Sequence, residues 1–296
     1  MERISRRKFF KTSALSALSL IYLPKFIRFK NTIFFEENEE IFKSKIKSFI
    51  DAGLGSKPLG GAIVEVGKSF LGTEYVANTL EINPNDEQLV VNLGAFDCVT
   101  FVENCMALAR CMRTGKTSYD DFKELLMKIR YRHGIIDGYT SRLHYFCDWI
   151  YDNQLKSYVN DITRDLGGEE YAKNINFMST HVNSYKQLAD SSNLEKIKAV
   201  EDEINLRTYF YIPKKNINKI SDRLQNGDII ATTTSIQGLD VTHTGYVIKD
   251  ESGGTYFLHA SSIMKEVIIS SNSLADYIKE DPKKTGIMVA RPLDFG

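Results

Sequence analysis

The hydrophobic pattern of the chain changes near residue 208, and this change limits the folds open to it. Before that point, apolar residues recur at helical spacing in the segments 37–51, 59–70, 119–130 and 193–206. After it, β-branched and aromatic residues form short runs typical of strands, at 209–212, 228–234, 240–249, 255–261, 266–270 and 287–292. Helices first and antiparallel strands last predict an α+β fold, with a helix packed on a small antiparallel sheet or barrel.

Local signals predict where several of these elements begin and end. Gly53 and Gly72 are placed to end helices, and Ser118 to cap the helix that follows it. Ser141 is expected to cap a helix that runs through residue 151. Residues 89–93 are expected to form a short strand or an extended segment.

Composition excludes some classes of function. The chain has 296 residues, with 38 Lys and Arg against 38 Asp and Glu, so no overall field attracts nucleic acid or a membrane surface. The four cysteines form no C-x-x-C pair, which argues against structural zinc, and no cofactor is predicted. Cys105, Cys111 and Cys147 are interpreted as buried thiols.

The first 30 residues have the features of an export signal. Basic residues precede an apolar run at 12–24 that is too short to cross a bilayer comfortably. The segment 5–11, Ser-Arg-Arg-Lys-Phe-Phe-Lys, resembles the twin-arginine export signal. We therefore expect the twin-arginine machinery to deliver the protein to the periplasm, where it is released or stays anchored if the segment is not cleaved. The alternative is a basic disordered tail.

One reactive side chain is predicted at a helix start. In the run 93–103, Asp97 and Cys98 open an apolar helical stretch. A thiol there feels the positive end of the helix dipole and unpaired backbone N–H groups, which favour the thiolate and could hold an oxyanion. Alternatively, Asp97 is only an N-cap and Cys98 a small buried residue.

Two histidines near the C-terminus supply a candidate base. The strands that contain His243 and His259 are joined by the turn-forming residues 250–254, which predicts a hairpin. With a three-residue loop at 250–252, His243 lies directly opposite His259 on one face of the sheet. A one-residue slip would send the two side chains to different faces.

These residues together resemble the NlpC-type papain-like peptidoglycan hydrolases. The resemblance rests on the cysteine at a helix start, the His-x-Gly-aromatic-Val run at 243–247 and a polar residue on the next strand. Residues 70–75 and 226–230 look like that family's Gly-x-x-Tyr segment and Gly-Asp turn. It implies a papain-like fold with extra helices in the middle of the chain. Val99 and Thr100 depart from the family's usual Ser-Gly after the cysteine.

The departure points to a narrower branch, the N-acetylmuramoyl-L-alanine amidase-like members, whose signatures resemble residues 73–81, 97–103 and 139–146. Membership implies one catalytic domain over 31–296, with a helical middle at about 115–207 and a core sheet at about 208–293. It also implies hydrolysis of the amide between the muramic lactyl group and L-alanine in soluble muropeptides. Cleavage within the stem peptide after D-glutamate is the alternative specificity, and a non-catalytic muropeptide-binding module is the alternative class.

The residue types suggest a mechanism. His243 would act as general base and keep Cys98 as thiolate, and His259 would orient His243. The Cys98 N–H is the candidate oxyanion donor, joined by the Tyr75 hydroxyl. Asp97 would cap the helix or bind the substrate's amine, and the cap is favoured.

Substrate contacts are predicted on a second segment. Arg142 and His144 are expected at a helix start, where they would bind the peptide or the sugar with help from Glu81. A solvated helix face is the alternative. The first interpretation predicts that Arg142→Ala raises the Michaelis constant and leaves the fold intact. A metal-dependent hydrolase is disfavoured because no His-Glu-x-x-His or clustered ligand set occurs. No obligate protein partner is inferred.

Overall fold

The computed structural model describes residues 23–82 and 86–294, with side chains described from residue 36 on. It divides into two compact units, Met1–Glu37 and Asn38–Gly296, and only the larger unit is treated below. Residues 1–22 of the predicted export signal lie outside the described residues. Within the described part of the chain, we find no helix that is both long and apolar enough to span a membrane.

Helices dominate the first two thirds of the larger unit. They are the end of α1 (Leu23–Asp51), then α2 (Leu59–Lys68), α3 (Cys98–Thr114), α4 (Tyr119–Arg130), α5 (Phe146–Leu155), α6 (Phe177–Thr180) and α7 (Ser191–Asn205). The predicted stop at Gly53 is confirmed, since it lies two residues after the end of α1 and has positive φ. Gly72 also has positive φ, but α2 ends four residues earlier, at Lys68, with Ser69 as its C-cap. Ser118 caps α4 through a capping box with Asp121, as expected.

The predicted start of the next helix is wrong. Ser141 ends a short 3₁₀ turn, and α5 begins only at Phe146. Its N-terminus is capped from far along the chain, because the Cys147 N–H donates to Asp240 Oδ2 at 2.8 Å. A buried carboxylate from the strand region thus replaces a local serine cap, which local sequence signals cannot reveal.

The strands form one mainly antiparallel sheet. They are β1 (Glu74–Tyr75), β2 (Ala95–Phe96), β3 (Val159–Asp161), β4 (Glu169–Glu170), β5 (Phe210–Pro213), β6 (Ile229–Thr234), β7 (Val241–Lys249), β8 (Thr255–Ser261), β9 (Glu266–Ile269) and β10 (Lys284–Pro292). Their order is β2-β1-β9-β8-β7-β6-β10-β5-β4, with β3 beside β10. Residues 89–93 form no strand, and Leu93 lies in a bend.

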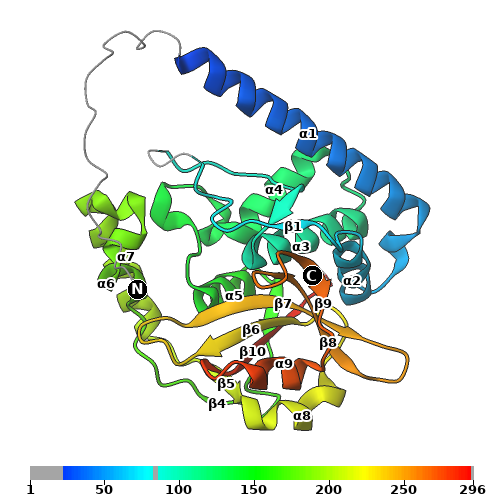
Figure 1. The fold of residues 1–296 in the computed structure, drawn as a ribbon, viewed down its shortest axis with the longest axis vertical. Coiled ribbons are helices and arrows are strands. Elements are labelled where there is room, and N and C mark those ends of the chain that lie inside the picture. The colour runs from blue at the N-terminus through cyan, green and yellow to red at the C-terminus, as the bar shows by residue number, and fades with distance from the viewer. Residues whose placement is uncertain (1–22, 83–85, 295–296) are drawn as a thin grey trace, which may run out of the picture. The chain divides into compact units, whose positions relative to one another are not determined.

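Helices cover both faces of the central strands (Figure 1). On one face α2 and α3 pack against alternate residues of the sheet such as Ala231, Tyr246 and Leu258. On the other face α8 (Ile217–Ile220) and α9 (Leu274–Glu280) pack against the intervening residues, such as Val247 and Phe257. The mixed helix-and-sheet class predicted from the hydrophobic pattern is confirmed, and the period-2 alternation explains the two cores.

The histidine hairpin forms, but its register differs from the prediction. Lys249 pairs with Thr255, so the loop has five residues instead of three, and His259 falls beside Gly245 instead of His243. The shift is two residues, and side chains alternate with a period of two, so both histidines still lie on the same face. They meet as diagonal neighbours, which long side chains can bridge.

Strands β7 and β8 separate near the histidines. Their pairing extends from Lys249–Thr255 to Tyr246–Leu258 and stops there. Beyond that pair, β7 stays bonded to β6 down to Val241, and β8 stays bonded to β9 up to Ser261. The sheet therefore opens into a fork between the two strands.

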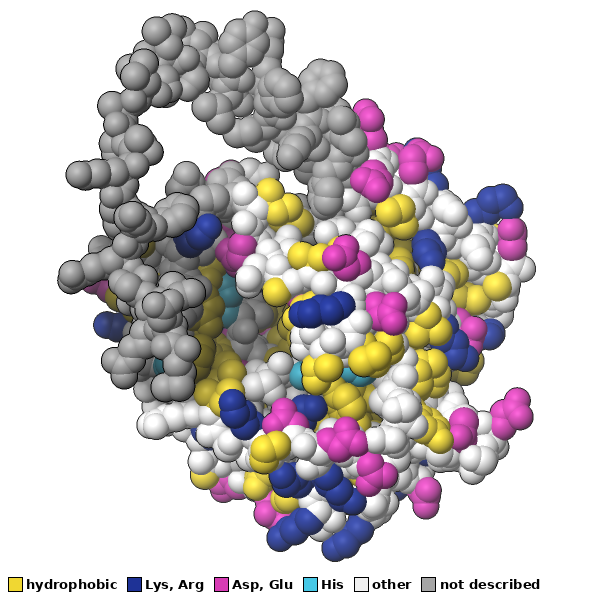
Figure 2. All heavy atoms as spheres, viewed as in Figure 1, with side chains coloured by type: hydrophobic (Ala, Val, Ile, Leu, Met, Phe, Trp, Pro, Cys, Tyr) yellow, Lys and Arg dark blue, Asp and Glu magenta, His cyan; other side chains and the backbone are white. Residues whose placement is uncertain are grey.

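Charged side chains are intermingled over most of the face in Figure 2. This distribution agrees with the equal numbers of acidic and basic residues in the sequence.

Candidate active site

Cys98 is the first residue of α3, as predicted. The Asp97 side chain accepts from the Thr100 N–H at 2.8 Å, and the Asp97 N–H donates to Thr100 Oγ1 at 3.0 Å, so the cap is a complete capping box. The Thr79 hydroxyl donates to the other Asp97 oxygen at 3.2 Å. Of the two roles considered for Asp97, the geometry supports the helix cap, which leaves its carboxylate little free capacity.

The thiol lies where the sheet opens. Cys98 comes from the α3 face, and the Thr244 N–H of β7 donates to it. Backbone N–H groups at Cys98, Val99 and Thr244 lower the thiol pKa, yet burial and then the neighbouring Asp97 carboxylate raise it to about 12. The expected resting thiolate is therefore not what this geometry favours, because desolvation outweighs the helix N-terminus.

The two histidines are in direct contact. His243 Nε2 and His259 Nδ1 are 2.7 Å apart, and their rings are nearly perpendicular at 87°. When His243 donates in this hydrogen bond, its Nδ1 carries the free lone pair that a general base needs. Gly245 makes the contact possible, because a Cβ there would lie 2.7 Å from the Cβ of His259.

Burial keeps this pair neutral. His259 is fully buried, with Phe257 stacked on its ring at 4.6 Å between centroids. Burial, followed by the charge of Lys284, lowers the pKa of His259 to about 4. Burial, then His259 and Lys284, lowers the pKa of His243 well below its ordinary value. A neutral thiol thus shares the site with neutral imidazoles at neutral pH.

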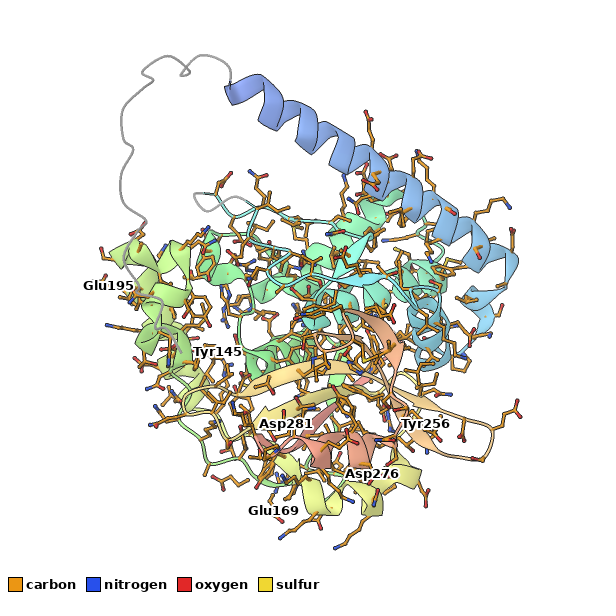
Figure 3. All side chains as sticks on the ribbon, viewed as in Figure 1. Tyr145, Glu169, Glu195, Tyr256, Asp276 and Asp281 are labelled. Carbon is orange, nitrogen blue, oxygen red and sulfur yellow. The ribbon has the colours of Figure 1, made fainter. Side chains whose placement is uncertain are left out.

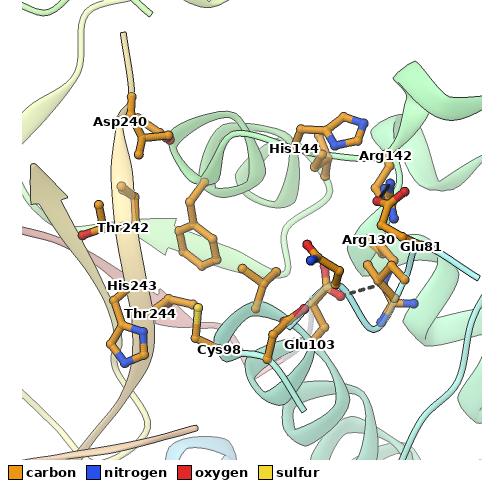
Figure 4. Close-up of a pocket in the computed structure, with 18 residues that line it drawn as sticks. Glu81, Cys98, Glu103, Arg130, Arg142, His144, Asp240, Thr242, His243 and Thr244 are labelled. Carbon is orange, nitrogen blue, oxygen red and sulfur yellow. Dashed lines mark hydrogen bonds and ion pairs between the residues drawn. The ribbon is translucent and has the colours of Figure 1, made fainter. Parts of the chain in front are cut away.

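A cavity of about 270 Å³ joins the predicted residues (Figure 4). It brings together, from segments far apart in the sequence, Cys98 and Asp97 of the α3 start, His243 of β7, and Glu81, Arg142 and His144 of the intervening loops. Figure 4 shows Cys98 beside His243 and Thr244, with Arg142 and Glu81 together across the cavity. Figure 2 shows a surface hollow in which histidine and apolar side chains are visible.

The wall opposite Cys98 is built from two ion pairs, one of them buried and the other with a partly exposed carboxylate. Arg130 Nε donates to Glu103 at 2.6 Å, both side chains are almost fully buried, and Trp149 donates to the same carboxylate. Arg142 pairs with Glu81 at 2.5 Å and lies 3.6 Å from a carboxylate oxygen of Glu87. The charged groups on this wall are paired with one another, although Arg130 Nη2 and Arg142 Nε have no hydrogen-bond partner among the described residues.

Arg142 and His144 lie in an extended segment, which corrects the predicted helix start. The Arg142 side chain is 6% exposed, and Gln187 bonds to the same Glu81 carboxylate, so the guanidinium is held within the wall. His144 Nε2 bonds to the Tyr139 carbonyl at 2.8 Å. Burial and the nearby Arg142 lower the pKa of His144 to about 3, so His144 is neutral as well.

Tyr75 reaches the site through strand pairing. It lies in β1 opposite Phe96, two residues before Cys98. Burial, then the Cys98 and Asp97 charges, raise the pKa of its hydroxyl to about 12, so it stays protonated and can donate. Tyr75 does not line the cavity itself.

Several residues of the site have no local sequence signal. Asp240 caps α5 and lines the cavity, Glu103 and Arg130 form its far wall, and Tyr277 lies 5.1 Å from the His259 ring. Each acquires its place only by long-range packing. Among the described residues, no group of three or more His, Cys, Asp or Glu is placed to hold a metal ion.

Comparison with known proteins gives one family. Residues 65–287 match the family model of AmiA-like, N-acetylmuramoyl-L-alanine amidase-like proteins. A search of the curated proteins found no match.

Solved structures resemble this chain over most of its length. An N-acetylmuramoyl-L-alanine amidase from Bacteroides uniformis is 37% identical to this chain, with a TM-score of 0.75. The match covers 80% of this chain and 99% of the amidase chain. A Bacteroides fragilis protein, provisionally named a xylanase, is 38% identical, with a TM-score of 0.72 and coverage of 77% and 99%. A Legionella pneumophila protein of the family model DUF1460 is 22% identical, with a TM-score of 0.68 and coverage of 89% and 97%, and supports the fold alone.

Proposed function

Since the chain belongs to the AmiA-like, N-acetylmuramoyl-L-alanine amidase-like family, we propose that it is a cysteine hydrolase of peptidoglycan fragments. The bond cleaved is the amide between N-acetylmuramic acid and L-alanine, in cell-wall turnover or recycling. The observation that carries the proposal is the His243–His259 hydrogen bond of 2.7 Å on the wall of the cavity that also holds Cys98. A nucleophile, a base and a group that orients the base are the parts that acyl transfer needs.

The reaction starts from the neutral pair. Cys98 Sγ attacks the lactyl carbonyl carbon as its proton passes to His243 Nδ1, and the C–N bond then breaks as His243 returns the proton to the leaving L-alanine nitrogen. The product of this half is a thioester on Cys98 and a free peptide amine. Water, deprotonated by His243, attacks the thioester, and the thiolate that leaves regains its proton from His243.

The oxyanion is stabilised by donors at the start of α3. The Cys98 N–H is the first candidate, since it is one of the unpaired N–H groups of the helix N-terminus. The protonated Tyr75 hydroxyl is the second candidate. Its place on β1 opposite Phe96 brings it close to Asp97 and Cys98.

The finer fold assignment is also proposed. A papain-like, NlpC-type arrangement is supported by α3 packing on β7 and β8, with the candidate base on β7 and its partner on β8. The extra helices at about 115–207 supply the cavity's far wall through α4 and the loop before α5.

A cavity of about 270 Å³ lies at the small end of ligand sites, which typically span ≈ 300–1,000 Å³. It therefore has room for the groups beside the scissile bond, and the rest of a muropeptide extends outside. Glycoside cleavage has weaker support, because Glu81, Asp97, Glu103 and Asp240 all have hydrogen-bond or ionic partners. Such cleavage needs a free pair of carboxyl groups.

The test uses the full chain beside its Cys98→Ala variant, incubated with a disaccharide-tetrapeptide under reducing conditions and followed by mass spectrometry. Free tetrapeptide plus disaccharide, absent with the variant, supports the amidase. A shortened stem supports the endopeptidase alternative after D-glutamate. No product, with Cys98 inert to iodoacetamide and intact muropeptide still bound, supports the binding module.

Export by the twin-arginine machinery to the periplasm is proposed from residues 5–11 alone. Replacing Arg6 and Arg7 together by Lys should retain the protein in the cytoplasm. Fractionation of cells that express the two forms measures this, and periplasmic recovery of the variant would contradict the proposal.

A further inference from the structure

Lys284 is a largely buried lysine that the mechanism above leaves unused. Its relative exposure is 8%, and within the described residues its Nζ has no hydrogen bond or ion pair. Its contact is with the face of the Tyr277 ring, 3.9 Å from the centroid. A buried charge without a paired counter-ion costs stability, so its presence needs a reason.

Two elements hold this ammonium behind the histidines. Lys284 opens β10 and pairs with Thr234 of β6, the strand between β10 and β7. Tyr277 belongs to α9, which covers the same face of the sheet as the two histidine side chains. The Tyr277 ring lies 5.1 Å from His259 and 6.5 Å from His243, between centroids.

We propose that Lys284, held over Tyr277, is a positioning residue whose charge, added to the burial of the two rings, makes the His243–His259 pair harder to protonate, so that His243 stays a free base to lower pH. The Tyr277 ring packs against both imidazoles and the ammonium, so the charge is held in place by a cation–π contact. The charge acts through space, in a region with little water to screen it.

Other charged groups face this pair from each neighbouring element. Cys98 and Asp97, at the start of α3, line the same cavity as His243. Glu280, the last residue of α9, and Asp281, the residue after it, which is labelled in Figure 3, act on Lys284, whose pKa burial lowers and these carboxylates raise. Both carboxylates are at least partly exposed, whereas Lys284 is buried, so water screens them more and the ammonium remains the stronger influence on the imidazoles.

The consequence for catalysis is a lower pH limit. A neighbouring cation disfavours the imidazolium, so protonation of the pair is postponed to more acidic pH. Without that cation, the pair would take up a proton nearer to neutral pH, and His243 could no longer accept the thiol proton there.

Only the role of His243 as a base rests on the proposed function. The first experiment therefore measures the charge effect of Lys284 without substrate. The chain contains five histidines, few enough to resolve by NMR after isotopic labelling of histidine. We expect Lys284→Met to raise the titration midpoint of His259 by about one pH unit, a tenfold change in proton affinity. Lys284→Arg keeps the charge and should keep the midpoint.

Lys283→Met is the matched control, because this neighbouring lysine is exposed. An unchanged His259 midpoint in Lys284→Met, or an equal rise in Lys283→Met, would overturn the inference. If Lys284→Met does not fold, Tyr277→Leu decides, since it removes the ring that holds the ammonium. An upward shift in that variant supports the inference, and no shift overturns it.

A second readout separates this inference from the proposed function. In Lys284→Met the acidic limb of the kcat/KM profile with muropeptide should move up by about the same one pH unit. A titration shift with no muropeptide hydrolysis by any form would support the charge effect and contradict the proposed function. An acidic limb that stays in place while hydrolysis persists would overturn the role assigned to Lys284.

Discussion

The two walls of the cavity differ in the charge of their side chains. The first wall carries Cys98 and His243, and the second carries Arg130 and Arg142. On the Cys98 and His243 side, burial holds the titratable side chains neutral, with a thiol pKa of about 12 and imidazole pKa values far below their ordinary range. On the Arg130 and Arg142 side, the guanidinium groups form ion pairs with Glu103 and Glu81. The thiol and imidazole groups of the first wall can exchange a proton, whereas the charged side chains of the second wall form ion pairs with one another. We therefore expect the first wall to take part in the reaction and the second wall to shape the cavity.

The largest expected difference between the walls is in activity. His243→Ala should lower kcat for muropeptide hydrolysis by roughly a hundredfold to ten-thousandfold, because the base is lost. Glu81→Gln, on the second wall, should change kcat by less than about tenfold, because it keeps the shape of the side chain. Steady-state kinetics measure both. Equal losses would show that the second wall takes part in the chemistry.

The next difference is in stability. Arg130→Met should lower the free energy of unfolding by about 3–5 kcal/mol, because it leaves the Glu103 carboxylate buried without its cation. The double variant with Glu103→Leu removes both charges and should recover much of this loss. Urea denaturation measures these values. A loss below about 1 kcal/mol in Arg130→Met would show that Glu103 is protonated or hydrated instead.

His259 behind the first wall and His144 beside Arg142 on the second (Figure 4) should make stability depend on acid. Folding lowers the pKa of His259 to about 4 and of His144 to about 3, so below the unfolded value near 6.5 the unfolded chain binds more protons. Stability therefore falls as the pH drops from about 6.5 towards 4. Between pH 7 and pH 5, each histidine should cost about 2 kcal/mol.

Denaturation at pH 7 and pH 5 tests this dependence, with His259→Gln as the variant in which the slope is reduced. His133→Gln is a matched control, because the His133 side chain is 73% exposed. If the stability of His259→Gln depended on pH as strongly as that of the wild type, the His259 imidazole would titrate normally in the folded state.

The smallest expected effect is on the reactivity of Cys98, and it separates the contributions of burial and of Asp97 to the thiol pKa. Asp97→Asn keeps an N-cap side chain and removes the carboxylate that raises the pKa of Cys98. Alkylation of Cys98 by iodoacetamide at pH 8 should then be about threefold to tenfold faster. Asp86→Asn, an exposed acidic residue, is the control. An unchanged rate would assign the raised pKa to burial alone.

Much of the candidate site could be read from the chain itself. The N-cap and thiol pair at Asp97 and Cys98 is a local signal, because a cap and its helix are neighbours in sequence. The common face of His243 and His259 follows from the period of two along a strand, and it persisted although the hairpin register differed by two residues. Six of the eight predicted site residues line one cavity.

Other features could not be read in this way, because their causes are non-local. The pairing of Arg142 with Glu81 joins residues 61 positions apart, and the cap on α5 comes from Asp240, 93 positions from Cys147. No local pattern distinguishes such residues from an exposed arginine or a strand aspartate. The direction of the Cys98 pKa shift could not be read from the sequence for a related reason, because desolvation depends on everything that packs around the thiol.

The sequence by itself determined the α+β class, the helix that begins at Cys98 and the shared face of the two histidines, because caps and periodicities are short-range properties. Only the tertiary structure decided the fork between β7 and β8, the ion-paired wall and the protonation states. These depend on which distant residues exclude water from one another, and the dielectric environment of a side chain is set by the fold as a whole.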